Sequence, residues 1–318
     1  MAYHTTPYLL LFLPAALLFY QITPAKWRSY TLLIFSYLFF WSFSEKLIIY
    51  LIGTTFLTHH ICIWMDTMDK RDKRKKRVFQ LGILLLLGTI LCLKYRNFFF
   101  GNVSKLAMVL HIDWSYQDQL IFLPIGISFY TLSAIGYMAD VYWGKVKAEY
   151  SLVKTASFLG FFPVIVEGPI CRWEDVEDTL FKNESVKAEN VFKGCYRIIW
   201  GLFKKMIIAD RLAVLVDKVY VGYESYSGAV IVVAAISYTI QLYMEFSGCM
   251  DMVIGSAGLF GIRLPENFSQ PFFAKTCTDF WKRWHITLGV WFKNYIFYPV
   301  SISKTARKWN KFTRKHFK

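Results

Sequence analysis

The stretch Asp279-Phe-Trp-Lys-Arg-Trp-His-Ile-Thr-Leu-Gly-Val-Trp-Phe-Lys-Asn-Tyr-Ile-Phe-Tyr-Pro-Val300 places cations, aromatic rings and one histidine inside an apolar region. On a helix, Asp279 and Arg283 are four residues apart, so we expect them to form an ion pair along one face. Trp281 and His285 have the same spacing, and we expect the indole to pack against the imidazole. Histidine exchanges a proton near neutral pH. His285 is therefore a candidate catalytic residue, the alternative being a histidine in an interfacial aromatic belt.

The composition around this stretch is that of a membrane protein. Of the 318 residues, 55% are hydrophobic and 19% aromatic, more than a soluble domain of this size needs for its core. A helix of roughly 17 to 25 apolar residues crosses a bilayer. Runs that approach this length cover residues 8–22, 30–43, 47–65, 78–93, 120–138 and 228–246. We predict an all-α, polytopic membrane protein whose first run is a retained helix and not a cleaved signal.

The formal net charge of +15 fits membrane topology better than nucleic-acid binding. The largest basic block, residues 70–77, is cytoplasmic by the positive-inside rule, which places the N-terminus outside and the loops with Lys26 and Lys145 inside. Lys94 falls outside under this orientation. We interpret residues 301–318 as a basic cytoplasmic tail against anionic lipid. Membrane lipid is thus an expected partner and nucleic acid is not.

Cysteine and histidine spacing gives no metal signal. The six cysteines have neither metal-ligand nor redox spacing. His59 and His60 lie within an apolar run, where a ligand or proton-relay role competes with simple helix packing. Neighbours on a helix point about 100° apart and do not share one metal without help.

From about residue 119 onward, Gly, Pro, Ser and isolated charges interrupt the apolar runs. Backbone groups freed by such breaks are tolerated only inside protein or along a water-filled cavity, so we predict re-entrant or broken helices around a central tunnel. Glu167 stands at one break, and Glu245 and Asp251 flank another at Ser247-Gly248. Carboxylates at that depth need a partner, a proton or a polar cavity. Six residues apart, Glu245 and Asp251 diverge by about 120° on a helix and need not form a catalytic pair.

Residues 191–211 carry several charges on an otherwise apolar helix. We expect an interfacial or cavity-lining helix, with Trp200, Lys204 and Lys205 at the lipid headgroups.

Six stretches resemble the membrane-bound O-acyltransferase family, in its bacterial branch that modifies alginate and teichoic acid. They are Pro124-Ile-Gly-Ile-Ser-Phe-Tyr-Thr131 with Asp140-Val-Tyr142, Phe162-Pro-Val-Ile-Val-Glu-Gly-Pro-Ile170, Gly201-Leu-Phe-Lys-Lys-Met-Ile-Ile-Ala-Asp-Arg-Leu-Ala213, Gln241-Leu-Tyr-Met-Glu-Phe-Ser-Gly248 with Asp251-Met252, Leu264-Pro-Glu-Asn-Phe268, and Phe280-Trp-Lys-Arg-Trp-His-Ile-Thr-Leu288. Each is weak alone, and their common order is what makes the resemblance specific.

The resemblance implies a membrane enzyme that moves an acyl group, here expected to be acetyl, from a cytoplasmic thioester toward an extracytoplasmic polysaccharide hydroxyl. The donor would be acetyl-CoA or an acyl-carrier thioester, with no bound cofactor or metal, and an extracytoplasmic acyltransferase partner protein is expected. The location implied is the bacterial inner membrane. One family histidine falls on His285. Further candidates that line the tunnel or bind substrate are Glu167, Tyr243, Glu245, Ser247, Asp251, Trp281, Arg283 and Trp284.

A second family histidine, in a Trp-His-Gly motif, has no counterpart in these residues, and His316 lacks the flanking residues that would make it one. We therefore expect one membrane domain, 1–318, with peripheral helices in 1–117, the family core in 118–300, the tail in 301–318 and the last family helices absent. A different class of function stays open, namely a non-catalytic scaffold or transporter-like protein that binds the acyl donor or carrier. No internal repeat supports transport.

Overall fold

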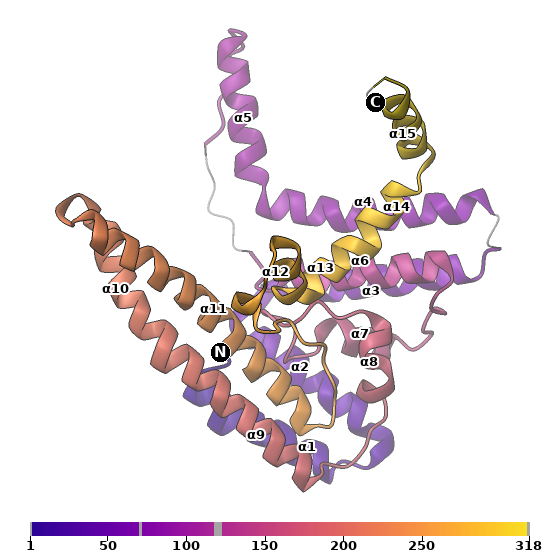
Figure 1. The fold of residues 1–318 in the computed structure, drawn as a ribbon. Coiled ribbons are helices and arrows are strands. Elements are labelled where there is room, and N and C mark those ends of the chain that lie inside the picture. Colours follow the sequence, from indigo (N-terminus) through magenta and orange to yellow (C-terminus); the bar gives the residue numbers. More distant parts are fainter. Residues whose placement is uncertain (1, 70–71, 118–122, 317–318) are drawn as a thin grey trace. The chain divides into compact units, whose positions relative to one another are not determined.

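The structure is a computed structural model that describes residues 2–69, 72–117 and 123–316 (Figure 1). Within these ranges all regular structure is helical apart from one isolated bridge between Phe268 and Trp284. The predicted all-α class is confirmed. The chain divides into two compact units, residues 1–31 with 167–318 and residues 32–166. The expected single membrane domain, with boundaries near 117 and 300, stays a prediction.

The unit of residues 32–166 is built around helix α3. Its elements are most of α2 (Arg28–Ser44), η3 (Glu45–Leu47), α3 (Ile48–Asp66), α4 (Lys73–Lys94), α5 (Arg96–Val109), α6 (Ile127–Trp143) and α7 (Leu152–Gly160). Helix α3 contacts α4, α6 and α7. His59, buried on α3, hydrogen bonds through Nδ1 to the Thr155 hydroxyl at 3.1 Å, whereas His60 is exposed. Helix packing is therefore the role that the structure gives His59.

Gly126 explains the motif that precedes α6. This residue caps the helix with φ +76°, and a Cβ built there would lie 1.8 Å from the Ile165 carbonyl oxygen. Only glycine combines a left-handed backbone with so close an approach. The Pro124-Ile-Gly sequence thus starts a helix in the interior of this unit, where most of α6 is buried.

The unit of residues 1–31 and 167–318 contains the remaining elements. They are η1 (Pro7–Phe12), α1 (Leu13–Ile22), η2 (Ala25–Trp27), α8 (Trp173–Leu180), α9 (Ala188–Leu202), η4 (Phe203–Ala209), α10 (Asp210–Val221), η5 (Tyr223–Ser225), α11 (Gly228–Leu259), η6 (Pro271–Phe273), α12 (Cys277–Arg283), α13 (Ile286–Phe292), η7 (Lys293–Phe297), α14 (Tyr298–Ser301) and α15 (Lys304–His316). Segments η1, η4 and η7 are π-helical, so α9, η4 and α10 form one continuous helical run.

Helices α9 and α11 lie against each other (Figure 1). Glycines line their contact. A Cβ on Gly201 would lie 2.5 Å from the Gly248 carbonyl oxygen, and one on Gly194 would lie 2.8 Å from the Gly255 carbonyl oxygen. On each helix the two glycines are seven residues apart, so they recur on one face. Small residues that let two backbones touch are how helices associate in apolar surroundings.

The N-terminal helix packs on the second half of α11. The Tyr8 hydroxyl donates a hydrogen bond to Ser256 Oγ at 3.0 Å, and the rings of Tyr20 and Phe260 meet edge to face at 5.3 Å. The first helical segment and α11 therefore share one core although they are far apart along the chain.

Three helical runs are long and apolar enough to cross a membrane, namely Ala25–Asp66, Lys73–Lys94 and Gly228–Leu259, and Pro7–Ile22 is a shorter apolar helix. The first of these contains both α2 and α3, which meet at a 3-10 turn where Glu45 has φ 42°. These runs agree with five of the six predicted spans.

One predicted span differs in extent, and one expected break is wrong. The predicted run 120–138 becomes a helix only at Ile127, because residues 123–126 are not helical and 120–122 lie outside the described residues. Ser247-Gly248 is not a break, because α11 runs continuously through it. Gly248 serves the contact with α9 instead.

Replacing Gly201 with alanine tests the close packing of α9 and α11. Alanine favours a helix by up to about 1 kcal/mol over glycine. Here its methyl group meets a backbone oxygen, so we expect a net loss of roughly 1 to 3 kcal/mol in the free energy of unfolding, measured by denaturant titration in detergent. Gly258→Ala, on α11 but facing open space, is the matched control. Equal stability of the two variants would contradict the close contact.

Candidate functional site

Asp251 is the centre of an ion-pair cluster between α9, η4 and α11. Arg197 Nε donates to its Oδ1 at 3.1 Å, and Lys204 Nζ donates to its Oδ2 at 2.6 Å. The Asp251 side chain is 12% exposed and the Lys204 side chain 14%. A carboxylate inside an apolar helix needs such partners, because an unpaired charge there is costly.

Lys205, the next residue of η4, forms a second cluster. Its Nζ lies 2.7 Å from Asp210 Oδ1 and 2.8 Å from Glu245 Oε2. The Asp210 N–H also donates to the Lys205 carbonyl, the five-residue step of a π-helix. The two lysines thus bind carboxylates, and their expected place at the lipid headgroups stays a prediction. Trp200, by contrast, is half exposed.

A small polar cavity adjoins the first cluster. The Arg197 guanidinium also binds Glu266 in bidentate fashion at 2.7 and 2.6 Å. Arg197, Lys204, Asp251 and Glu266 line a cavity of about 210 Å³, together with Tyr243, Ser247, Met250 and residues 267–270. We call it the inner cavity. Its walls therefore carry fixed charges of both signs.

His285 is held by Asn267, whose side chain also lines the inner cavity. His285 Nδ1 lies 3.1 Å from Asn267 Oδ1, and Asn267 is fully buried. The same Oδ1 accepts the Thr287 N–H at 3.2 Å and the Thr287 hydroxyl at 3.0 Å. A backbone hydrogen bond joins the same two segments, since the Ile286 N–H donates to the Asn267 carbonyl at 2.9 Å.

These contacts determine the tautomer of His285. An atom that accepts a backbone N–H is an oxygen, so the amide of Asn267 presents Oδ1 to the imidazole. Nδ1 must then be the protonated ring nitrogen, which leaves the lone pair of a neutral ring on Nε2. Burial lowers the pKa of His285, which lies outside the three candidate spans, and so favours this neutral form.

The helical spacing assumed from Asp279 to His285 is broken at the histidine. Helix α12 ends at Arg283, Trp284 is extended, and His285 has φ 48° before α13 begins. Trp281 is therefore not stacked on the imidazole and is 62% exposed, which corrects that expectation. Phe246 of α11 takes its place, with its ring edge to face with the imidazole at 4.9 Å. The predicted pair of Asp279 with Arg283 is confirmed at 3.0 Å.

Aromatic rings surround the loop that carries Asn267. Phe268 forms the isolated bridge with Trp284, and their rings meet at 5.1 Å. Tyr243 contacts the rings of Phe268, Phe272 and Trp284 at 5.6, 5.1 and 6.0 Å. This packing holds residues 267–269 beside 283–286.

The structure brings together some of the predicted site residues. Tyr243, Ser247 and Asp251 line the inner cavity, and His285 is bonded to its wall through Asn267. Glu245 instead pairs with Lys205. Glu167 is exposed, lies in the predicted turn and accepts a weak hydrogen bond from Cys249 Sγ at 3.3 Å.

Sequence reasoning missed Asn267, Glu266 and the pairing of Arg197 and Lys204 with Asp251. The signal for Asn267 was present, since Leu264-Pro-Glu-Asn-Phe268 is one of the family-like stretches, but its contact with His285 spans 18 residues of irregular chain. Among the described residues no group of three or more His, Cys, Asp or Glu could hold a metal ion.

A model of the membrane-bound O-acyltransferase family matches residues 145–314, more than half of the chain and all of the site above. The chain belongs to the membrane-bound O-acyltransferase family. The recognised resemblance is thereby confirmed, and with it a helical membrane protein.

Curated relatives of this membrane-bound O-acyltransferase chain come from several bacteria. It is 33% identical over 297 residues to a probable alginate O-acetylase of Pseudomonas aeruginosa, covering 93% of this chain and 56% of the relative. A peptidoglycan O-acetyltransferase of Helicobacter pylori is 29% identical, with 94% and 61% covered. A teichoic acid D-alanyltransferase of Bacillus subtilis is 30% identical, with 59% and 48% covered. The chain thus spans about half to three-fifths of the length of these relatives.

Replacing Asn267 with alanine tests how His285 is held. It removes the acceptor of three donors, so we expect a loss of roughly 1 to 3 kcal/mol in unfolding free energy and a mixture of imidazole tautomers. The ¹⁵N chemical shifts of His285 report the tautomer, and Asn267→Asp, which keeps an acceptor oxygen, should retain Nδ1–H. A wild-type protein with its proton on Nε2 would refute the assignment.

Proposed function

We propose that this chain is part or all of an O-acyltransferase in which His285 acts as general base on an acceptor hydroxyl. The observation that supports this most directly is the imidazole whose Nδ1–H is bonded to buried Asn267, so that the basic lone pair is on Nε2. The lowered pKa of His285 also favours the neutral imidazole, and a general base must be unprotonated to act.

The proposed reaction transfers the acyl group once, from the sulfur of the thioester to the oxygen of the acceptor. Nε2 accepts the hydroxyl proton as the acceptor oxygen attacks the thioester carbonyl carbon. The new C–O bond forms, the C–S bond breaks, and the imidazolium returns its proton to the departing thiolate. The products are an ester and a free thiol, so no other reactant is required. General-base catalysis of this kind contributes about 10²- to 10⁴-fold in rate.

The relatives favour acetyl as the acyl group and a cell-surface polysaccharide as the acceptor. The relatives named for O-acetyl transfer to alginate and peptidoglycan cover 93% and 94% of this chain, whereas the D-alanyltransferase covers 59%. We therefore favour acetyl over D-alanyl and a sugar hydroxyl as its acceptor.

We further propose an inner-membrane location with a cytoplasmic donor, an outside N-terminus and an extracytoplasmic acyltransferase as partner. The charge distribution supports this orientation, although Lys70 and Arg71 of the main basic block lie outside the described residues. Helix α15 supports a membrane-facing tail, because Trp309 and Phe312 are exposed on a helix that also carries Lys304, Arg307 and Lys308.

Replacing His285 with alanine tests the catalytic proposal. We expect transfer of radiolabelled acetyl from a thioester to polysaccharide, measured in membranes that contain the complete natural gene product, to fall by about 10²- to 10⁴-fold. His60→Ala, at an exposed histidine in the other unit, should retain wild-type transfer. Unchanged transfer in His285→Ala, or no transfer in wild type, would favour the non-catalytic scaffold.

The pH dependence of transfer follows from the lowered pKa. The free enzyme is active with neutral His285, so kcat/KM should fall with decreasing pH. Because burial lowers the pKa of His285 from its usual 6.5, the midpoint of that fall should lie below pH 6.5. A rate profile between pH 4.5 and 8 measures it, and a midpoint above 6.5 would contradict the buried imidazole.

A further inference from the structure

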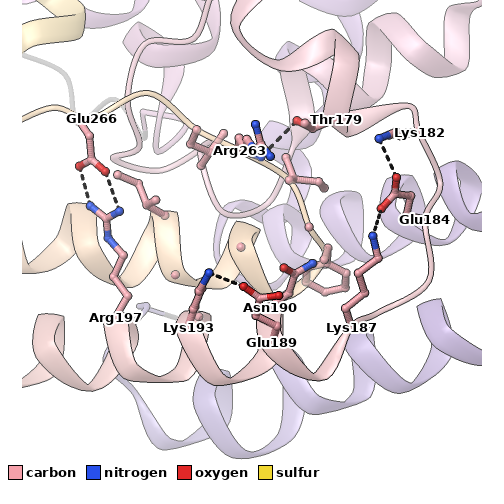
Figure 2. A pocket seen from close by; sticks show the side chains of 18 residues that line it. Thr179, Lys182, Glu184, Lys187, Glu189, Asn190, Lys193, Arg197, Arg263 and Glu266 are labelled. Atoms are coloured by element: carbon pink, nitrogen blue, oxygen red, sulfur yellow. Dashed lines mark hydrogen bonds and ion pairs between the residues drawn. The ribbon is translucent and has the colours of Figure 1, made fainter.

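Two cavities apart from the inner cavity differ in the chemistry of their walls. One, of about 610 Å³, is lined by charged side chains that form ion pairs with one another, such as Arg197 with Glu266 and Lys193 with Glu189 (Figure 2). The other, of about 420 Å³, belongs to the unit of residues 32–166. Three residues from each of α2, α3 and α7 line it, and none of these nine described residues is charged. We call it the apolar groove.

The apolar groove lies beside two contacts that fix α7 against α2 and α3. At the end of α7, a Cβ built on Gly160 would lie 2.9 Å from the ring of Tyr37, so this turn is packed tightly on α2. Earlier in α7, the Thr155 hydroxyl is bonded to His59 of α3. Ala156 follows Thr155 at about 100° round the helix and lines the groove. The groove is therefore a fixed feature of how the three helices pack.

The two hydroxyl groups in the apolar groove are already hydrogen bonded within the protein. Thr55 Oγ1 donates to the Leu51 carbonyl at 2.9 Å, so its hydrogen is used inside α3. The Tyr37 hydroxyl lies 3.4 Å from Thr55 Oγ1 and is therefore the donor of that contact. Neither hydroxyl has a hydrogen left for a ligand, and a polar group buried without a partner is costly. The groove thus fits an aliphatic chain.

The mouth of the apolar groove belongs to a surface that fits the hydrocarbon of a bilayer. Helices α2 and α3 form the run Ala25–Asp66, which is long and apolar enough to cross a membrane. Ile34 of α2 and Phe56 of α3 line the groove and are 58% and 47% exposed. Leu38 and Ile49, four and seven residues away on the same helix faces, are exposed as well. The groove is therefore continuous with an apolar surface at membrane depth.

The size of the apolar groove favours a single chain over a helix of another protein. An α-helix with its side chains is about 10 to 12 Å wide, so about 420 Å³ holds no more than roughly one of its turns. A groove left empty would deprive its lining of dispersion contacts on one side. A flexible acyl chain of the surrounding lipid can fill this irregular space.

We propose that the apolar groove holds one acyl chain of a membrane phospholipid, which stays with the protein while the surrounding lipids exchange. Lipid tails are as apolar as leucine, so the chain is held by close packing and not by the hydrophobic effect. The chain completes the core of this unit by joining α7 to α2 and α3. The inference is independent of the proposed acyl transfer, because the groove and His285 belong to different units.

Photo-crosslinking of the chain in nanodiscs tests this site. The probe is a phosphatidylcholine with a diazirine on one acyl chain, and mass spectrometry identifies the labelled residues. We expect stronger labelling at residues 152–156 than at exposed residues of α11. Ala156→Phe puts a ring into the groove and should lower labelling of Leu152 and Val153 about tenfold, equivalent to about 1.4 kcal/mol. Ala235→Phe, the same substitution at an exposed position of α11, should leave it unchanged.

Native mass spectrometry after washing in detergent gives a second reading. Wild type and Ala235→Phe should retain one phospholipid per chain, and Ala156→Phe should retain none. Val153→Phe, at a half-buried position of the groove, takes its place if Ala156→Phe does not fold. Equal labelling of α7 in wild type and the groove variant, or no retained phospholipid in wild type, would overturn the proposal. A dimer that the groove variant loses would instead assign the groove to a second copy of this chain.

Discussion

The rest of the site depends on the contact between α9 and α11, whose backbones meet directly at glycines. Gly201 lies against Gly248 and Gly194 against Gly255, so the two backbones meet directly at these positions. At that separation a lysine or arginine on one helix reaches a carboxylate on the other, so charges that apolar surroundings would otherwise exclude become partners. The ion pairs of this unit therefore depend on the close packing of the two helices.

The same contact accounts for what sequence alone did not show. Local sequence patterns and the stretches that resemble the family predict the all-α class, the Asp279–Arg283 pair and the importance of His285. The partners of Asp251 do not, because Arg197 and Lys204 are about 50 residues away along the chain. Helical periodicity predicts neighbours within one helix and is silent about which helix lies opposite.

The errors have an equally physical origin. Periodicity placed Trp281 against His285 because it assumed an unbroken helix, yet the histidine has a left-handed backbone that no periodicity predicts. Conversely, Ser247-Gly248 suggested a break in the helix, but α11 is continuous there and Gly248 lets the backbone of α9 come close. Glycine has both uses, and only the partner helix distinguishes them.

The π-helical segment η4 has a consequence for how this helical run can vary. A π-turn corresponds to one extra residue in an α-helix, and it is what sets Lys205 and Asp210 at a five-residue step. Loss of one residue between Phe203 and Ala209 would let this segment return to a regular α-helix, in which Lys205 and Asp210 would be four residues apart and still on one face. This helical run can therefore lose one residue here with less change in how α9 and α10 face α11 than a regular α-helix would undergo.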